Sequence, residues 1–111
     1  MKNITIRNAI ESDSHSIHEL LMELAEFEKI LDSVDSTIES THNALFGNKP
    51  SANAIVAIVE EKIIGAAIYF FNYSTFVGKR GLYLEDIYIT PEYRGNGIGT
   101  KMMIELSLIH I

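Results

Sequence analysis

The sequence predicts a mixed α/β domain built around one sheet, with elements in the order β-α-α-β-β-β-α. Three observations predict it. Four stretches are strand-like, with alternating or β-branched apolar residues, and three stretches show apolar residues at helical spacing. The two kinds alternate along the chain in a way typical of α/β folds. The length of 111 residues allows one domain at most, and no repeat or linker interrupts it.

The first strand and the first helix are predicted between residues 4 and 27. Ile4 and Ile6 alternate with Thr5 and Arg7, which indicates a short strand. Asp13 or Ser14 can cap a helix, and the apolar residues that follow at helical spacing are Ile17, Leu20, Leu21, Leu24 and Phe27. The opposite face, which we expect to lie in water, carries Glu19, Glu23 and Glu26.

A second helix is predicted to begin at Ser36-Thr37-Ile38-Glu39, which has the pattern of a capping box. Its apolar residues are Ile38, Leu45 and Phe46, and Gly47 can close it. The segment Asn48-Lys49-Pro50-Ser51 is then expected to be a loop.

Three strands and a helix follow. Residues 54–59 and 63–71 are apolar and are separated by the polar pair Glu61-Lys62, which predicts a hairpin. Residues 74–81 are expected to be a loop. Residues 82–89 form a further predicted strand, ended by Thr90-Pro91. After a glycine-rich turn, a last helix is expected from about Thr100.

Composition and charge exclude several classes of protein. The chain has no cysteine, so it has neither disulfides nor a thiolate nucleophile or metal ligand. The four histidines show no metal-ligand spacing. Residues 1–78 carry 5 Lys/Arg and 11 Asp/Glu, and residues 79–111 carry 4 of each. This acidic balance argues against a nucleic-acid partner. It suits a cationic small molecule, although an acidic surface that only contacts water explains it equally well.

The glycine turn is the strongest functional signal. Gly95, Gly97 and Gly99 lie between a predicted strand and a predicted helix. Glycines there let backbone N–H groups face a ligand without a Cβ in the way, and the helix N-terminus adds partial positive charge. Such a turn suits a diphosphate, with Arg94 as a fixed charge at its mouth.

Two nucleotide motifs do not fit this turn. The dinucleotide fingerprint fails because Thr100 occupies the place of its third glycine, and the P-loop pattern is absent. Taken alone, the turn could simply begin a helix.

The wider context resembles the GNAT acetyltransferase superfamily. Arg94-Gly95-Asn96-Gly97-Ile98-Gly99 matches the [QR]-x-x-G-x-[GA] acetyl-CoA signature of that family, with a strand before it and a helix after it. Tyr83-Leu84-Glu85-Asp86 and Tyr93-Arg94-Gly95 resemble the diamine (spermidine/spermine) N-acetyltransferase group more specifically. The similarity extends upstream to Glu23-Leu24-Ala25-Glu26-Phe27-Glu28 and to Tyr73 with Val77-Gly78-Lys79.

The resemblance implies a role for each of these segments. The backbone of Ile87, Tyr88 and Ile89 would bind the pantetheine arm of acetyl-CoA. The diphosphate would be held by Arg94 and by the backbone of Gly95, Asn96, Gly97, Ile98, Gly99 and Thr100. Glu85 would be the catalytic base. The amine substrate would contact Phe27, Glu28, Glu85 and Asp86.

The chemistry of acetyl transfer agrees with a carboxylate base. A primary amine has a pKa of about 10, and it attacks a thioester only after it has lost a proton. Neighbouring residues on a regular strand point to opposite faces, so we expect only one of Glu85 and Asp86 to face the cleft. Both could instead be ordinary carboxylates at a sheet edge.

The C-terminal residues carry a separate expectation. Leu106-Ser107-Leu108-Ile109-His110-Ile111 is the translation of the end of a widely used transposon-based sequencing adapter. We therefore expect a partial acetyltransferase domain at 1–105 and a non-native tail at 106–111, the alternative being a natural helical tail. The resemblance implies that two elements are missing from this chain, namely a further strand and a helix with a tyrosine that protonates the leaving thiolate.

The sequence thus predicts a cytoplasmic enzyme that acetylates a primary amine, a polyamine or diamine, using acetyl-CoA and no metal. The N-terminus lacks a signal peptide and no apolar stretch could span a membrane. We expect a homodimer for the full-length protein, and neither nucleic acid nor a membrane as partner. The alternatives are a lysine-like amino acid, an aminoglycoside or a protein N-terminus as substrate, or a non-catalytic acyl-CoA-binding or dimerisation module.

Overall fold

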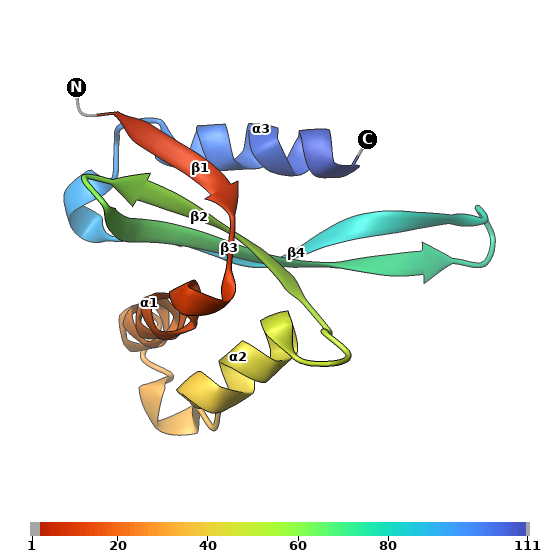
Figure 1. The fold of residues 1–111 in the computed structure, drawn as a ribbon, viewed down its shortest axis with the longest axis horizontal. Helices are drawn as coiled ribbons and strands as arrows, with labels where there is room; N and C mark the ends of the chain where they lie inside the picture. The colour runs from red at the N-terminus through yellow and green to blue at the C-terminus, as the bar shows by residue number, and fades with distance from the viewer. Residues whose placement is uncertain (1–2, 111) are drawn as a thin grey trace.

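A computed structural model describes residues 3–110 and shows the predicted order of elements (Figure 1). Residues 1 and 2 of the expected 1–105 domain and residue 111 of the expected tail lie outside the described residues. The helices are α1 (Ser14–Phe27), α2 (Ile38–Phe46) and α3 (Ile98–His110). The strands are β1 (Ile4–Asn8), β2 (Asn53–Val59), β3 (Lys62–Ser74) and β4 (Lys79–Ile89).

The four strands form one antiparallel sheet in the order β1-β2-β3-β4, so β1 and β4 lie at its edges. Helices α1 and α2 cover one face of the sheet and α3 covers the other (Figure 1). The three layers follow from the sequence pattern, because both faces of the central strands are apolar and each needs a cover.

Two hydrophobic clusters fill the space on either side of the sheet. Alternate residues of β2 point to opposite faces, so Val56 belongs to the α1 side and Ile55 to the α3 side. The α1-side cluster is completed mainly by Ile17, Leu20, Leu45, Ala66 and Tyr88. The α3-side cluster contains Val59, Ile64, Ala67, Tyr69, Ile98, Met102 and Leu106. Residues 106–110 continue α3, and whether they are native stays a prediction.

An ion pair joins β1 to the start of α1. Asp13 occupies the N-cap position but its side chain does not cap the helix. Instead its carboxylate accepts hydrogen bonds from Arg7, at 2.7 and 3.1 Å, and from the backbone N–H of Ile10 at 2.8 Å. The hydrogen bond from Arg7 lowers the pKa of Asp13 below its usual value. The expected capping role of Asp13 is therefore wrong, because a stronger charged partner lies nearby.

The capping box of α2 lies one residue later than predicted. Thr37 accepts a hydrogen bond from the backbone N–H of Ser40 at 3.0 Å, and the Ser40 hydroxyl accepts one from the backbone N–H of Thr37 at 2.8 Å. A serine thus takes the place expected for Glu39. Gly47 follows the helix as predicted but is extended, with φ −71° and ψ −176°, rather than left-handed.

Both hairpin turns differ from their predictions: the β2–β3 turn is shifted by one residue, and the β3–β4 turn is shorter. The β2–β3 turn is Glu60-Glu61, both with positive φ, instead of Glu61-Lys62. The expected loop 74–81 contracts to the four residues 75–78, because β3 and β4 pair as far as Ser74 and Lys79. The two strands therefore form an arm that projects beyond the helices (Figure 1). Stacking of Phe70 on Tyr83 supports it.

Candidate active site

The glycine turn leads from β4 into α3 with its backbone exposed. Gly95 and Gly97 have φ values of +84° and +75°, in the left-handed region that other residues rarely adopt. A Cβ at either position would have no atom within 4 Å. Since the protein itself leaves this space empty, the reason for glycine is backbone conformation and access from outside.

The first turn of α3 presents unused hydrogen-bond donors beside these glycines. The backbone N–H of Lys101 bonds to the carbonyl of Gly97 at 3.1 Å. The N–H groups of Ile98, Gly99 and Thr100 precede this bond, so they have no acceptor within the helix. The helix begins at Ile98, two residues before the predicted start. A ring of backbone donors at a helix N-terminus is suited to an anion.

A groove of about 310 Å³ lies next to this turn. It is formed by the end of β4, the end of α1 and the start of α3. Six of its lining residues are predicted site residues or their neighbours on the strand, namely Phe27, Ile87, Tyr88, Ile89, Arg94 and Gly99, and Leu24 completes it. The structure therefore brings together residues separated by some seventy positions in the sequence.

Arg94 is held at the mouth of the groove by three contacts. Its Nε–H donates to the carbonyl of Ile89 at 2.8 Å. Its guanidinium carbon lies 5.1 Å from the ring centroid of Tyr88 and 5.3 Å from that of Phe27, within the range of cation–π attraction. Phe27, predicted to face the core, is 67% exposed and serves this contact instead.

A β-bulge lies at Glu85. Ile68 of β3 pairs with Asp86, and the next residue, Tyr69, pairs with Leu84, so Glu85 is an extra residue in β4. Bulges are found next to active sites, where they turn side chains out of the regular alternation.

The bulge interrupts the regular alternation of side chains between Leu84 and Ile87. Leu84 and Ile87 both contact the α3 side of the sheet, whereas Asp86 pairs with Ile68 of the α1 side. The expectation that Glu85 and Asp86 point to opposite faces assumed regular alternation, which the bulge interrupts, so it stays a prediction. Burial raises the pKa of Asp86, and the nearby charges of Glu85 and Glu28 raise it further.

The remaining predicted residues lie on the turn and the helix start. Asn96 donates from its side chain to the carbonyl of Tyr93 at 3.1 Å, which fixes the turn. Ile98, the first residue of α3, is buried against the sheet with 2% exposure, so it can offer a ligand only its backbone. Gly95, Gly97 and Thr100 are open to solvent or nearly so. Part of the predicted set thus lines the groove, and Glu28 and Asp86 directly follow or precede its lining residues Phe27 and Ile87 in the chain.

Sequence reasoning missed one contact in this region. The hydroxyl of Tyr88 donates to the carboxylate of Glu23 at 3.1 Å, although the two residues are 65 positions apart. Glu23 was assigned only to the wet face of its helix. Its position one turn before Phe27 was the available signal, because residues four apart share a helix face.

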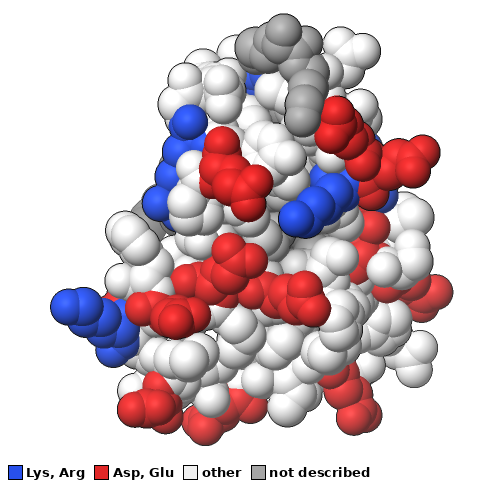
Figure 2. Space-filling model, turned by 90° about the vertical axis from the view of Figure 1, so that its left-hand side faces the viewer, with Lys and Arg blue, Asp and Glu red and all other residues white. Residues whose placement is uncertain are grey.

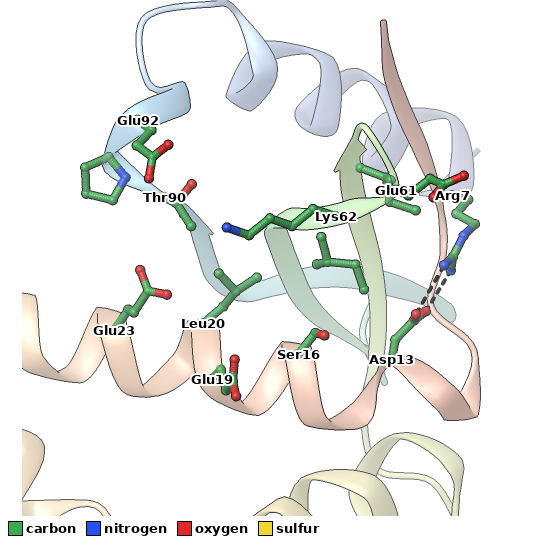
Figure 3. Close-up of a pocket in the computed structure, with 13 residues that line it drawn as sticks. Arg7, Asp13, Ser16, Glu19, Leu20, Glu23, Glu61, Lys62, Thr90 and Glu92 are labelled. Carbon is green, nitrogen blue, oxygen red and sulfur yellow. Dashed lines mark hydrogen bonds and ion pairs between the residues drawn. The ribbon is translucent and has the colours of Figure 1, made fainter. Parts of the chain in front are cut away.

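A second cavity, of about 560 Å³, is larger but lacks these features. Its lining includes Glu19, Glu23, Glu61, Lys62 and Glu92, together with the Arg7–Asp13 ion pair (Figure 3). It contains none of the predicted site residues, and no glycine turn opens onto it. Its carboxylates contribute to the acidic character of the molecule, which Figure 2 shows as a band of acidic side chains on one face.

Comparison with known proteins identifies the family of this chain. The acetyltransferase (GNAT) family matches residues 14–107. The chain belongs to the GNAT acetyltransferase family. Its curated relatives in this family include a thialysine N-epsilon-acetyltransferase from Bos taurus, 40% identical over 93% of this chain and 65% of that protein. A spermidine/spermine N(1)-acetyltransferase-like protein 1 from Homo sapiens is 36% identical over 100% of this chain and 17% of that protein.

Solved structures show that this GNAT chain shares its fold with proteins of low sequence identity. An aminoglycoside acetyltransferase from an uncultured soil sample has a TM-score of 0.80 and 19% identity, over 96% of this chain and 69% of that chain. A ribosomal-protein-alanine N-acetyltransferase from Brucella melitensis has a TM-score of 0.78 and 22% identity, over 95% and 70%. The chain spans about 65% of the length of the thialysine N-epsilon-acetyltransferase from Bos taurus.

Residues 3–110 lack two features. No helix in this range is both long and apolar enough to cross a membrane. No group of three or more His, Cys, Asp or Glu side chains in it is arranged to hold a metal ion.

Proposed function

We propose that the protein transfers an acetyl group from acetyl-CoA to a primary amine, and that the amine is a polyamine or diamine. The observation that carries the proposal is the groove between the end of β4 and the N-terminus of α3, together with Asp86 beside its lining residue Ile87 and within electrostatic reach of Glu28 and Glu85. Membership of the GNAT family and the names of the relatives support the class of reaction.

The acyl donor fits the residues present. Acetyl-CoA supplies a thioester whose carbonyl carbon accepts the amine. The N–H groups of Ile98, Gly99 and Thr100 and the open backbone at Gly95 and Gly97 are suited to its diphosphate. The outer edge of β4 is unpaired among the described residues, so its backbone can hydrogen-bond the pantetheine arm.

The amine binds at the carboxylate end of the groove. Glu28 and Asp86 are sequence neighbours of Phe27 and Ile87, which line the groove. Burial raises the pKa of Asp86, and repulsion from the charges of Glu85 and Glu28 raises it further. An ammonium group that enters the cluster offsets this repulsion, so the site favours a substrate with more than one positive charge.

Glu85 acts as the base. In this proposal it removes a proton from the substrate ammonium through a water molecule, while Glu28 and Asp86 hold the charge at the distal end of the amine. The neutral nitrogen then attacks the thioester carbonyl, an amide bond forms, and the carbon–sulfur bond breaks. As the amide forms, the nitrogen loses its second proton, the leaving thiolate takes up one proton, and no covalent enzyme intermediate is needed.

A panel of amines tests the substrate class. Because the chain spans 65% of the length of its relatives, turnover should be measured with the complete gene product, whatever its length. We expect spermidine and diamines to be acetylated with a higher kcat/KM than thialysine, lysine, an aminoglycoside or a peptide N-terminus. Acetylation of peptides with unreactive polyamines would contradict the proposal. Binding of acetyl-CoA without turnover of any amine would favour a non-catalytic acyl-CoA-binding module.

A further inference from the structure

The Tyr88–Glu23 hydrogen bond lies behind the groove rather than in it. Tyr88 is 7% exposed, so its hydroxyl has little contact with water and needs a protein acceptor. Glu23, on the exposed face of α1, supplies that acceptor across the gap between helix and strand. Glu23 also lines the 560 Å³ cavity, as Figure 3 shows, so it stands between the two hollows.

The ring of Tyr88 supports Arg94. The guanidinium lies over this ring on one contact and near Phe27 on another. Among residues 3–110 its single hydrogen bond uses Nε–H, so both Nη groups remain available to a ligand. The Nε–H bond to Ile89 anchors the guanidinium at one point, so its remaining orientation depends on where the Tyr88 ring is held, since Phe27 is largely exposed.

We propose that Glu23 is a positioning residue, which fixes the Tyr88 ring and thereby directs the Nη groups of Arg94 towards the diphosphate of the acyl donor. This inference rests on the proposed function, because it assumes an acyl-CoA in the groove. Glu23 itself touches neither substrate. It acts through Tyr88 and Arg94, a path of one hydrogen bond and one cation–π contact.

The path predicts an effect that depends on the phosphate groups of the donor. Glu23→Ala should lower kcat/KM for acetyl-CoA about fivefold through a higher KM, with little change in kcat. It should leave kcat/KM for S-acetylpantetheine, which has no diphosphate, unchanged. Glu23→Gln should behave like the wild type, because its amide oxygen can still accept the Tyr88 hydroxyl.

Two further variants keep the test decisive if Glu23→Ala loses stability. Tyr88→Phe retains the ring but not the hydrogen bond, so it should reproduce the donor-dependent loss. Glu19→Ala removes another exposed carboxylate of α1, one that pairs with His15 rather than Tyr88. It should leave kcat/KM unchanged for both donors.

Each remaining outcome overturns a specific statement. Equal loss with both donors means that Glu23 only stabilises the fold, and no loss with either means that it has no role in the groove. In both cases the proposed function stands if Gly97→Ala still weakens acetyl-CoA binding. If neither the wild type nor any variant binds acetyl-CoA, the proposed function fails instead.

Discussion

Gly97 and Gly78 have almost the same backbone conformation at opposite ends of β4, with φ values of +75° and +73°. Neither would bring a Cβ closer than 3.9 Å to another atom of the protein. The two glycines therefore form a matched pair for mutation, because an alanine would be strained at either position and only Gly97 lies in the glycine turn.

Gly97→Ala should weaken coenzyme A binding roughly tenfold, because a methyl group would stand between the backbone and the diphosphate. Both Gly97→Ala and Gly78→Ala should cost about 1 kcal/mol of stability, because alanine is strained at positive φ. Calorimetric titration with coenzyme A and urea unfolding of both variants provide the measurements. Equal affinity for coenzyme A in the two variants would contradict the proposal that this turn binds the diphosphate.

Asp86 makes the fold sensitive to pH in an unusual direction for a carboxylate. Its pKa is higher in the folded state than in the unfolded chain, so the folded state holds a proton more tightly. This contribution is fully present below the unfolded pKa and is lost as pH rises through the folded pKa. Asp86→Asn should therefore gain stability over wild type at neutral pH, and the gain should shrink as the pH falls towards the unfolded pKa. Urea melts at several pH values measure it, with Asp32→Asn as an exposed control.

Some of these features could be predicted from the sequence and others could not. The glycine turn could be predicted because it needs only local conformation. The bulge at Glu85 could not, because it depends on pairing with β3, seventeen residues upstream. The Glu23–Tyr88 bond likewise joins two elements whose packing the sequence does not state.

At the scale of elements, two neighbouring hydroxyl residues at the start of α2 have different roles. Thr37 caps the helix and exchanges hydrogen bonds with Ser40, whereas Ser36 is exposed one residue earlier. Thr37→Ala should cost about 1 kcal/mol of unfolding free energy. Ser36→Ala should cost almost nothing. Chemical denaturation of the two variants measures both effects. A loss of stability in Ser36→Ala but not in Thr37→Ala would mean that Ser36 is the capping residue.

The positions of the turns had a similar ambiguity in the sequence. Glu60, Glu61 and Lys62 are all polar, so the hydrophobic pattern alone allows the turn at either pair. The register of β2 against β3, with Val59 opposite Lys62, selects Glu60-Glu61. Both glutamates then adopt positive φ, which sequence reasoning reserves for glycine and asparagine.

For the whole molecule, the order of the elements was predicted from apolar periodicity and is confirmed. The layers form because each helix has one apolar face and the sheet has two. How far the arm extends was not predictable, because residues 74–81 contain the turn-forming residues Gly78 and Gly81 and little alternation. Pairing of β3 with β4 extends the strands through that stretch.

The edge of β4 should govern the behaviour of this chain in solution. Among residues 3–110 it has no partner strand on its outer side, and Tyr83, Leu84 and Met103 are exposed beside it. Such an edge is a template for association. We expect the chain expressed alone to elute from a size-exclusion column above its monomer mass and to unfold without a sharp urea transition. A monomer with a cooperative transition would show that the edge is harmless.

A charge at this edge provides the control. Leu84→Lys should reduce association, because a lysine on an edge strand opposes pairing with a second strand. Light scattering of the eluted peaks gives the mass directly. An unchanged mass would place the contact elsewhere on the molecule.

The bulge at Glu85 also determines which changes of chain length β4 can accept. On the arm side of it, Asn72 faces Gly81 and Ser74 faces Lys79 in regular register. Removing two residues from each strand there shortens the arm and leaves every remaining side chain on its original face. A single deletion between Glu85 and Ile89 instead reverses the faces of the residues on one side of it. Insertions and deletions in related genes should therefore be frequent and even-numbered in the arm, and rare in residues 85–89.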